Sequence, residues 1–261
     1  MAILFINFLY NKIMNFEKLL QMNSKSLIQD PIFPDSINSN AAYFENFTSQ
    51  ATTILSLKFN NGVIMVGDRR ATQGNYIADD NIVKVFDVDE SSMIGVAGTT
   101  AIAFELIKRF KVEVLHYEKV KNKKLSFEGK VSHLSSLIKS NINLINAGLI
   151  AVPIFAGKSN KEFKISSFDA LGGAYYEDNY SSVGSGSRLA NVYLQDNFNI
   201  FNLKDAITCG IKALQIAASN DSATVGPSIE NNIFPTIYVC TSEDLMELSN
   251  EEIKSYMKDL K

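Results

Sequence analysis

Three residues that could do chemistry lie in and just after the first apolar hairpin of the sequence. Thr52 opens a β-branched run, Asp68 follows the return run, and Lys84 lies in an otherwise apolar stretch, IVKVF. A threonine hydroxyl becomes a nucleophile when a nearby base takes its proton. A buried lysine can change the proton affinity of its neighbours, with Asp68 as its counter-ion. The spacing equally fits a plainer interpretation, in which Lys84 is a strand residue facing water.

Histidine does not supply the base that such a nucleophile needs. His116 and His133 both fall in predicted helices, where we expect surface or packing roles, so neither a histidine triad nor a two-histidine metal site is predicted. The run 184–187 (GSGS) is too short to hold a phosphate, and no cofactor is expected. A free α-amine, with an ordinary pKa of about 7.7, is another candidate base. It requires removal of everything before Thr52.

The composition of the segment before Thr52 is consistent with its removal. From Asn23 to Gln50 the chain is rich in Asn, Ser and Pro without a sustained period, and its character changes abruptly at Thr52. We therefore predict a poorly structured leader over 1–51. The apolar run 2–10 has no preceding basic residue, so a secretory signal is not expected, and Met14 is an alternative start.

The remaining composition is that of an ordinary globular protein. Of 261 residues, 46% are hydrophobic and 20% are charged, with a net charge of −3, which excludes a basic nucleic-acid-binding surface. The densest basic run, 119–124, is interpreted as a solvated loop. Cys209 and Cys240 are expected to be core thiols in a reducing compartment, and no run is long enough to span a membrane. A cytoplasmic protein without nucleic-acid or membrane partners is expected.

Hydrophobic periodicity predicts strands and helices that occur in runs rather than in strict alternation. Such segregation, with an Asn-Gly hairpin at 60–62, favours an α+β fold whose helices cover the faces of antiparallel sheets. The predicted strands are 52–59, 63–67, 92–97, 151–156, 163–168, 181–184 and 236–241, and the predicted helices are 100–117, 131–149 and 203–218.

Six motifs over residues 52–245 occur in the order seen in one known family. The chain resembles the β subunits of 20S proteasomes, in particular those of the bacterial, actinobacterial type, which are N-terminal-nucleophile hydrolases. The motifs are 52–54 (TTI), 67–72 (GDRRAT), 84–85 (KV), 95–98 (GVAG), 183–187 (VGSGS) and 221–224 (DSAT).

The resemblance implies a four-layer αββα sandwich over 52–261, preceded by a propeptide at 1–51 that the protein removes by cutting itself at Ala51–Thr52. Thr52 would be the nucleophile of a threonine endopeptidase, and the N–H of Gly98 would stabilise the oxyanion. The other implied catalytic residues are Asp68, Lys84, Ser185, Asp221 and Thr224. The implied substrate-binding residues are Ala71, Thr72, Ile82, Phe86, Val96, Thr100 and Phe104, which predict cleavage after large apolar residues.

Three positions depart from the family pattern. Ala51 stands where glycine is usual, and slower self-cleavage is expected because glycine reaches strained backbone conformations more cheaply. Thr224 replaces a serine but keeps the hydroxyl. Val225 replaces a glycine, which predicts a different turn at this point.

The implied partners are rings of α subunits, further β subunits in an α7β7β7α7 barrel, a ring-shaped ATPase activator, and unfolded or tagged proteins as substrates. Two alternatives stay open: an HslV-type double-ring protease without α rings, and a structural β subunit without activity. A short leader would favour the first alternative, and loss of Thr52, Asp68 or Lys84 would favour the second.

Overall fold

The computed structural model describes residues 52–260, apart from 74–75, 146–147 and 161. The predicted propeptide and its cleavage position at Ala51 lie outside the described residues. The following description concerns the part from Thr52 onward.

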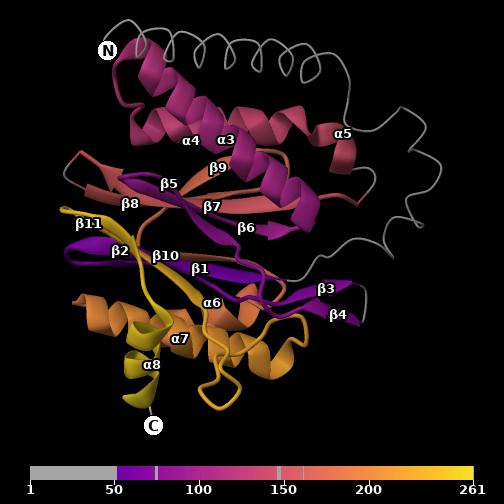
Figure 1. Cartoon of the computed structure of the whole chain (residues 1–261), viewed down its shortest axis with the longest axis vertical. Coiled ribbons are helices and arrows are strands. Elements are labelled where there is room, and N and C mark those ends of the chain that lie inside the picture. The colour runs from indigo at the N-terminus through magenta and orange to yellow at the C-terminus, as the bar shows by residue number, and fades with distance from the viewer. Residues whose placement is uncertain (1–51, 74–75, 146–147, 161, 261) are drawn as a thin grey trace, which may run out of the picture. The chain divides into compact units, whose positions relative to one another are not determined.

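Two five-stranded antiparallel sheets form the middle of the fold (Figure 1). The first sheet has the order β10-β1-β2-β11-β12, and the second has the order β5-β6-β7-β8-β9. The strands of the first sheet are β1 (Thr53–Phe59), β2 (Gly62–Gly67), β10 (Tyr180–Gly184), β11 (Thr236–Thr241) and β12 (Leu245–Glu247). Those of the second are β5 (Val85–Asp89), β6 (Ser92–Gly98), β7 (Ala151–Ser159), β8 (Glu162–Phe168) and β9 (Ala174–Glu177). A separate ribbon pairs β3 (Ala71–Gln73) with β4 (Tyr76–Asp79).

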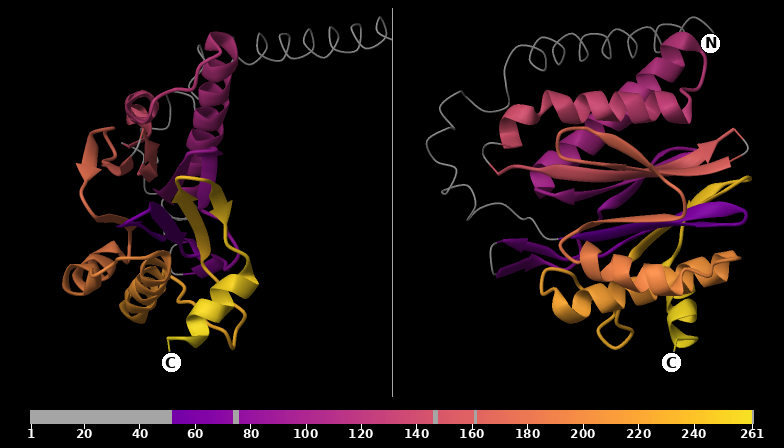
Figure 2. Two further views of the ribbon diagram at one scale, coloured as in Figure 1. Left: turned by 90° about the vertical axis from the view of Figure 1, so that its left-hand side faces the viewer. Right: turned by 180° about the vertical axis from the view of Figure 1, so that it is seen from behind.

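Helices cover the outer face of each sheet, and the two views of Figure 2 show the same four layers. On the second sheet lie α3 (Thr100–Lys121), α4 (Phe127–Ser140) and the short α5 (Ile142–Ile145). On the first lie α6 (Ser187–Asn197) and α7 (Leu203–Asn220), while α8 (Asn250–Lys258) packs against α7. The predicted α+β fold of two antiparallel sheets flanked by helices is confirmed.

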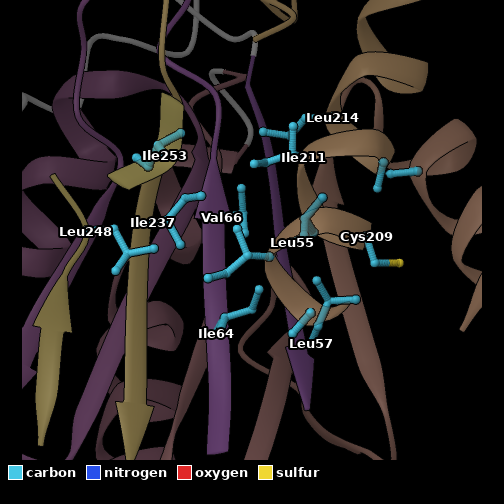
Figure 3. Packing of buried hydrophobic residues seen from close by; sticks show 14 of the residues in the cluster. Leu55, Leu57, Ile64, Val66, Cys209, Ile211, Leu214, Ile237, Leu248 and Ile253 are labelled. Atoms are coloured by element: carbon cyan, nitrogen blue, oxygen red, sulfur yellow. The ribbon is translucent and has the colours of Figure 1, made fainter. Parts of the chain in front are cut away.

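The core between the first sheet and its helices is apolar and closely packed. Leu55 of β1, Val66 of β2 and Leu214 of α7 are fully buried members of one cluster, which Figure 3 shows between the sheet and the helix. The Asn202 side chain and the N3 residue Asp205 form a capping box that starts α7. This packing fixes the strands from whose ends the candidate site projects.

Several predicted elements differ from the structure. The helix predicted over 131–149 begins earlier, at Phe127, and α4 ends at Ser140, where the N–H of the C-cap residue Asn141 donates to the Ile138 and Lys139 carbonyls. The basic run 119–124 is only partly a loop, since Lys119 and Lys121 lie in the last turn of α3, where cations favour the helix dipole. The strands β3, β4, β5, β9 and β12 and the helices α6 and α8 were not predicted.

The cysteines lie in the core and the histidines lie on helices, as predicted. Cys209 and Cys240 are buried free thiols, and burial raises the pKa of each to about 11. His116 lies exposed on α3, and His133 lies on α4 with Nε2 2.7 Å from Glu113 Oε2. None of the helices in the described part of the chain combines the length and apolar character that crossing a bilayer requires.

Candidate active site

The first hairpin brings Asp68 beside the start of β1. The pairing of β1 with β2 places Ile54 opposite Gly67, so the chain leaves β2 next to Thr53. The N–H of Asp68 donates to the Thr53 carbonyl (3.1 Å), and the Thr53 N–H donates back to Asp68 Oδ1 (2.9 Å). The position of Asp68 is therefore set by the residue that follows Thr52.

Asp68 and Lys84 form a buried ion pair. Lys84 precedes β5 and donates from Nζ to Asp68 Oδ1 (2.8 Å) and to the Arg70 carbonyl. Asp68 is 1% exposed and Lys84 is 5% exposed, so the water-facing interpretation of Lys84 is wrong. Burial is the largest influence on both groups: it raises the pKa of Asp68 and lowers the pKa of Lys84, while their mutual attraction opposes both shifts.

The Asp68 carboxylate is saturated with donors. Besides Lys84 and Thr53, the N–H groups of Arg70 (3.0 Å) and Val225 (3.2 Å) donate to Oδ2. Four donors on two oxygens favour the ionised carboxylate and hold it in one orientation. Asp68 thus joins the first hairpin, the segment before β5 and the loop after α7.

A second cluster joins Ser185, Asp221 and Thr224. Asp221 caps the end of α7, and its Oδ2 accepts from the hydroxyls of Ser185 and Thr224, each at 2.6 Å. The Ser185 N–H donates to the Thr52 carbonyl (3.0 Å). These three residues, which the family resemblance implies are catalytic, therefore lie together, and Ser185 is bonded to the main chain of Thr52.

Thr53 connects the two clusters, which sequence reasoning missed. Its hydroxyl lies 2.6 Å from Thr224 Oγ1 and accepts from the Gly186 N–H (3.0 Å), while its own N–H binds Asp68. A buried threonine in a strand is usually interpreted as a packing residue, and no feature of the neighbouring sequence indicated a different role for Thr53. The pairing of β1 with β10 and with β2 and the loop after α7 bring these residues together.

Two glycines, the predicted oxyanion residue Gly98 and Gly184 beside Thr52, adopt backbone conformations that other residues avoid. Gly98 has φ +116°, and a Cβ there would lie 2.1 Å from the Ile150 carbonyl oxygen. Gly184 has φ +105°, and a Cβ there would lie 1.7 Å from the Thr52 carbonyl oxygen. Both positions therefore require glycine, and Gly184 allows β10 to approach Thr52 closely.

Val225, which stands where the family usually has glycine, donates a main-chain hydrogen bond to Asp68. It is 7% exposed, and it does not adopt a positive φ. Its N–H reaches Asp68, a contact that any residue except proline can make. The turn after Thr224 therefore needs no glycine in this chain.

Three of the seven predicted substrate-binding residues line one hollow. Ile82, Phe86 and Phe104 border a space of about 500 Å³, and the two rings meet edge to face with centroids 6.0 Å apart. Ala71, Thr72, Val96 and Thr100 do not line it. Its other lining residues are Val83, Ile107, Lys108 and Lys111, and the two lysines were not predicted.

Arg70 is a further residue that the sequence did not single out. Its guanidinium binds the Asp80 carboxylate at 2.7 and 3.2 Å and donates to the Ser222 carbonyl (3.0 Å). It thereby ties the loop after α7 to the segment between β4 and β5. The residues described contain no group of three or more side chains arranged to hold a metal ion.

Comparison with known proteins points to one family. Residues 48–229 match the family model described as proteasome subunit. The chain is 42% identical over 208 residues to the proteasome subunit beta of Streptomyces griseus, covering 77% of this chain and 73% of that one. It is 39% identical over 211 residues to the proteasome subunit beta of Stackebrandtia nassauensis, covering 78% and 76%.

Proposed function

Because the chain belongs to the β subunits of the proteasome family, we propose that it is a catalytic subunit, a threonine endopeptidase that uses Thr52 as its nucleophile. One observation carries this proposal. The buried Asp68–Lys84 pair is hydrogen-bonded to the main chain of Thr53, the residue next to Thr52. A structural β subunit would not need to retain a buried charge pair at this position, since such pairs are costly to bury.

The reaction needs only groups that this chain supplies. Thr52 Oγ1 adds to the carbonyl carbon of the substrate peptide while the free α-amine of Thr52 takes the hydroxyl proton. The developing oxyanion accepts a hydrogen bond from the Gly98 N–H. The C–N bond then breaks, the amine passes its proton to the leaving nitrogen, and an ester to Thr52 remains. Water attacks this ester, giving a proton to the same amine; the bond from the acyl carbon to Oγ1 then breaks, the amine returns the proton to Oγ1, and the acyl part of the substrate leaves as its carboxylic acid.

The two charged clusters have separate tasks in this scheme. The Lys84 ammonium lowers the proton affinity of the Thr52 amine and hydroxyl, and Asp68 holds Lys84 in place. Asp221, with Ser185 and Thr224, orients the amine and the attacking water. The Ser185 N–H supports this assignment because it fixes the Thr52 carbonyl.

Activation requires cleavage of the Ala51–Thr52 bond, because an amide nitrogen cannot serve as the base. We propose that Thr52 Oγ1 attacks the Ala51 carbonyl, that the acyl group moves from nitrogen to oxygen, and that water hydrolyses the ester. The propeptide would keep Thr52 blocked until the particle has assembled.

The hollow beside Phe86 and Phe104 supports a preference for a large apolar residue before the scissile bond. Its walls are largely apolar, and one of its two lysines, Lys111, is paired with Asp87 at 3.0 Å. Fluorogenic peptides with Leu or Phe at this position should be cut faster than those with Glu or Arg. Faster cleavage of the charged peptides would contradict the preference.

The particle we propose has two outer α rings and two inner β rings of seven subunits each, served in the cytoplasm by a ring-shaped ATPase that delivers unfolded or tagged proteins. This arrangement rests on family analogy. The HslV-type alternative predicts a double ring that forms without α subunits, and the native mass of the purified particle distinguishes the two.

The decisive test is the intact mass of the chain after co-expression with the α subunit of the same organism. We expect a chain that begins at Thr52, and a Thr52→Ala chain that stays full length in assembled particles. Peptide hydrolysis should appear only in the wild type. A wild-type chain that assembles but is neither cut nor active would favour the structural-subunit alternative.

A further inference from the structure

We propose that Thr53 is a positioning residue, whose hydroxyl sets the geometry between Thr52 and the Asp221–Thr224 pair. The inference rests on the proposed function of Thr52 and adds a residue to it. Thr53 is fully buried and lies between the two clusters described above. Its N–H binds Asp68 on one side, and its hydroxyl binds Thr224 on the other.

The direction of each hydrogen bond follows from the number of protons available. The Asp221 carboxylate can only accept, so Thr224 gives its single hydroxyl proton to Asp221 Oδ2 (2.6 Å). Thr224 Oγ1 must then accept from Thr53 Oγ1 (2.6 Å). Thr53 Oγ1 in turn accepts from the Gly186 N–H (3.0 Å). The result is one directed chain from the Gly186 amide through two hydroxyls to a carboxylate.

This chain joins segments that are far apart in the sequence. Gly186 precedes α6, Thr53 begins β1, and Asp221 follows α7, so each segment gains a fixed distance to the others. Hydrogen bonds in such a series polarise one another and are stronger together than singly. A valine at position 53 would fill nearly the same volume but would break the series at its middle.

The close approach at Gly186 is an independent sign that this geometry is built in. A Cβ at Gly186 would lie 2.6 Å from Thr53 Oγ1 and 3.0 Å from Thr224 Oγ1. The absence of that atom is what allows the Gly186 N–H to reach the Thr53 hydroxyl. The GSGS run therefore serves this contact, and its second glycine is explained by it.

The consequence for the reaction is positional. Thr53 is held by its main chain at Asp68 and by its side chain at Thr224, and Thr52 is the next residue. Loss of the hydroxyl contact removes the side-chain link from Thr53 to the Asp221–Thr224 pair, while the main-chain bonds to Asp68 and from Ser185 to Thr52 remain. Small misplacements of reacting groups have large effects on rate, so we expect kcat to fall about tenfold with KM nearly unchanged.

The test compares Thr53→Val with Thr53→Ser in assembled particles. The serine variant keeps the hydroxyl and should recover most of the activity, whereas the valine variant should lose about tenfold in kcat. Ser56→Ala is the matched control, since Ser56 lies buried in the same strand and donates from its hydroxyl to the Ile64 carbonyl (2.8 Å). That control should lower the thermal midpoint while leaving kcat unchanged.

Three results would overturn the inference: equal kcat in the valine and serine variants, a loss in KM alone, or the same loss of kcat in Ser56→Ala. If Thr53→Val does not assemble, Thr53→Ala, which cannot overpack, replaces it in the same comparison. An active and correctly cut wild type separates failure of this inference from failure of the proposed function.

A double-mutant cycle supplies the second readout. If Thr53 acts through Thr224, then Thr53→Val should cost little further activity in a Thr224→Val background. Additive losses in the double variant would show that the two hydroxyls act separately, and this too would overturn the inference.

Discussion

The substitution Asp68→Asn tests the buried ion pair with almost no change in side-chain size. The amide group of asparagine has one acceptor and one donor, whereas the carboxylate has two acceptors. In either orientation its NH₂ meets two donors: Lys84 Nζ and the Thr53 N–H, or the N–H groups of Arg70 and Val225. Lys84 also loses its negative partner in a site where it is 5% exposed.

These losses determine how far the free energy of unfolding should fall in Asp68→Asn. Removing one partner of a buried ion pair destabilises a protein by about 3–5 kcal/mol, because the other charge stays buried and uncompensated. A typical domain has a total stability of about 5–15 kcal/mol, so the variant should lose a large fraction of it. The matched variant Lys84→Met should lose less, because Asp68 keeps three main-chain N–H donors.

The stability lost in Asp68→Asn should depend on pH, and the direction of this dependence follows from the pKa of Lys84. Burial already lowers the pKa of Lys84, and without Asp68 the largest opposing influence is gone, so this pKa falls further. The unfolded chain keeps the ordinary lysine pKa of about 10.4, so between the lowered native pKa and this value it binds more protons than the native state. The stability lost in Asp68→Asn should consequently shrink as the pH rises from about 7 to about 9.5.

Urea unfolding of the full-length chain at several pH values measures this loss. A Thr52→Ala background keeps processing out of the comparison. In the double variant Asp68→Asn with Lys84→Met, the additional pH dependence should disappear, since the group that titrates is absent. A pH-dependent loss that persists in the double variant, or a loss below about 1 kcal/mol in Asp68→Asn, would refute the assignment of a costly buried charge pair.

Two further predictions concern Gly184, which lies beside Thr52, and Asn202, which caps the start of α7. Gly184→Ala should prevent cleavage at Thr52 in assembled particles, because its Cβ would lie 1.7 Å from the Thr52 carbonyl oxygen at a positive φ; intact mass measures this, and normal cleavage would contradict it. Asn202→Ala should lower the free energy of unfolding by about 1 kcal/mol through loss of the α7 capping box, while Asn202→Asp should not. Urea unfolding measures both, and equal stability of the two variants would contradict the prediction.

Elements with strong local signals were predictable from the sequence. The helix predicted over 100–117 is confirmed as α3, which buries one apolar side, and the Asn-Gly hairpin joins β1 to β2 as expected. The helix predicted over 131–149 was wrong at its end, since α4 stops at Ser140 and the apolar residues up to Ile145 lie in the separate short helix α5. Periodicity reports which residues are apolar, and it does not report where the backbone hydrogen bonds of a helix stop.

The elements that were missed depend on distant partners or on weak periodicity. Strands β4 and β9 are exposed or half-exposed, so their residues do not alternate in hydrophobicity. Helix α6 buries only Ala190 and Leu194. Helix α8 carried a signal that was overlooked, since Ser249 and Glu252 have the spacing of a capping box and form one.

The residues of the candidate site also divide into those that the sequence could indicate and those that it could not. Asp68 and Lys84 could be paired from the sequence because each is unusual in its setting, a charge beside apolar strands. Thr53 could not be found, since a threonine in a β-strand has no unusual feature. Its role depends on a contact with Thr224, 171 residues away, which exists only after β1, β10 and the end of α7 have come together.

The effect of each departure from the family pattern depends on which atom that position contributes to the site. Val225 contributes its N–H to Asp68, and every residue except proline has that group. Thr224 contributes a hydroxyl to Asp221, which threonine and serine share. Neither change removes an atom that the contacts use. Ala51 is different in kind: it lies outside the described residues, and we expect it to act through the backbone conformations open to it, since glycine reaches strained ones more cheaply. The rate of cleavage before Thr52 is therefore where this chain should differ from its relatives, while turnover by the cut chain should not.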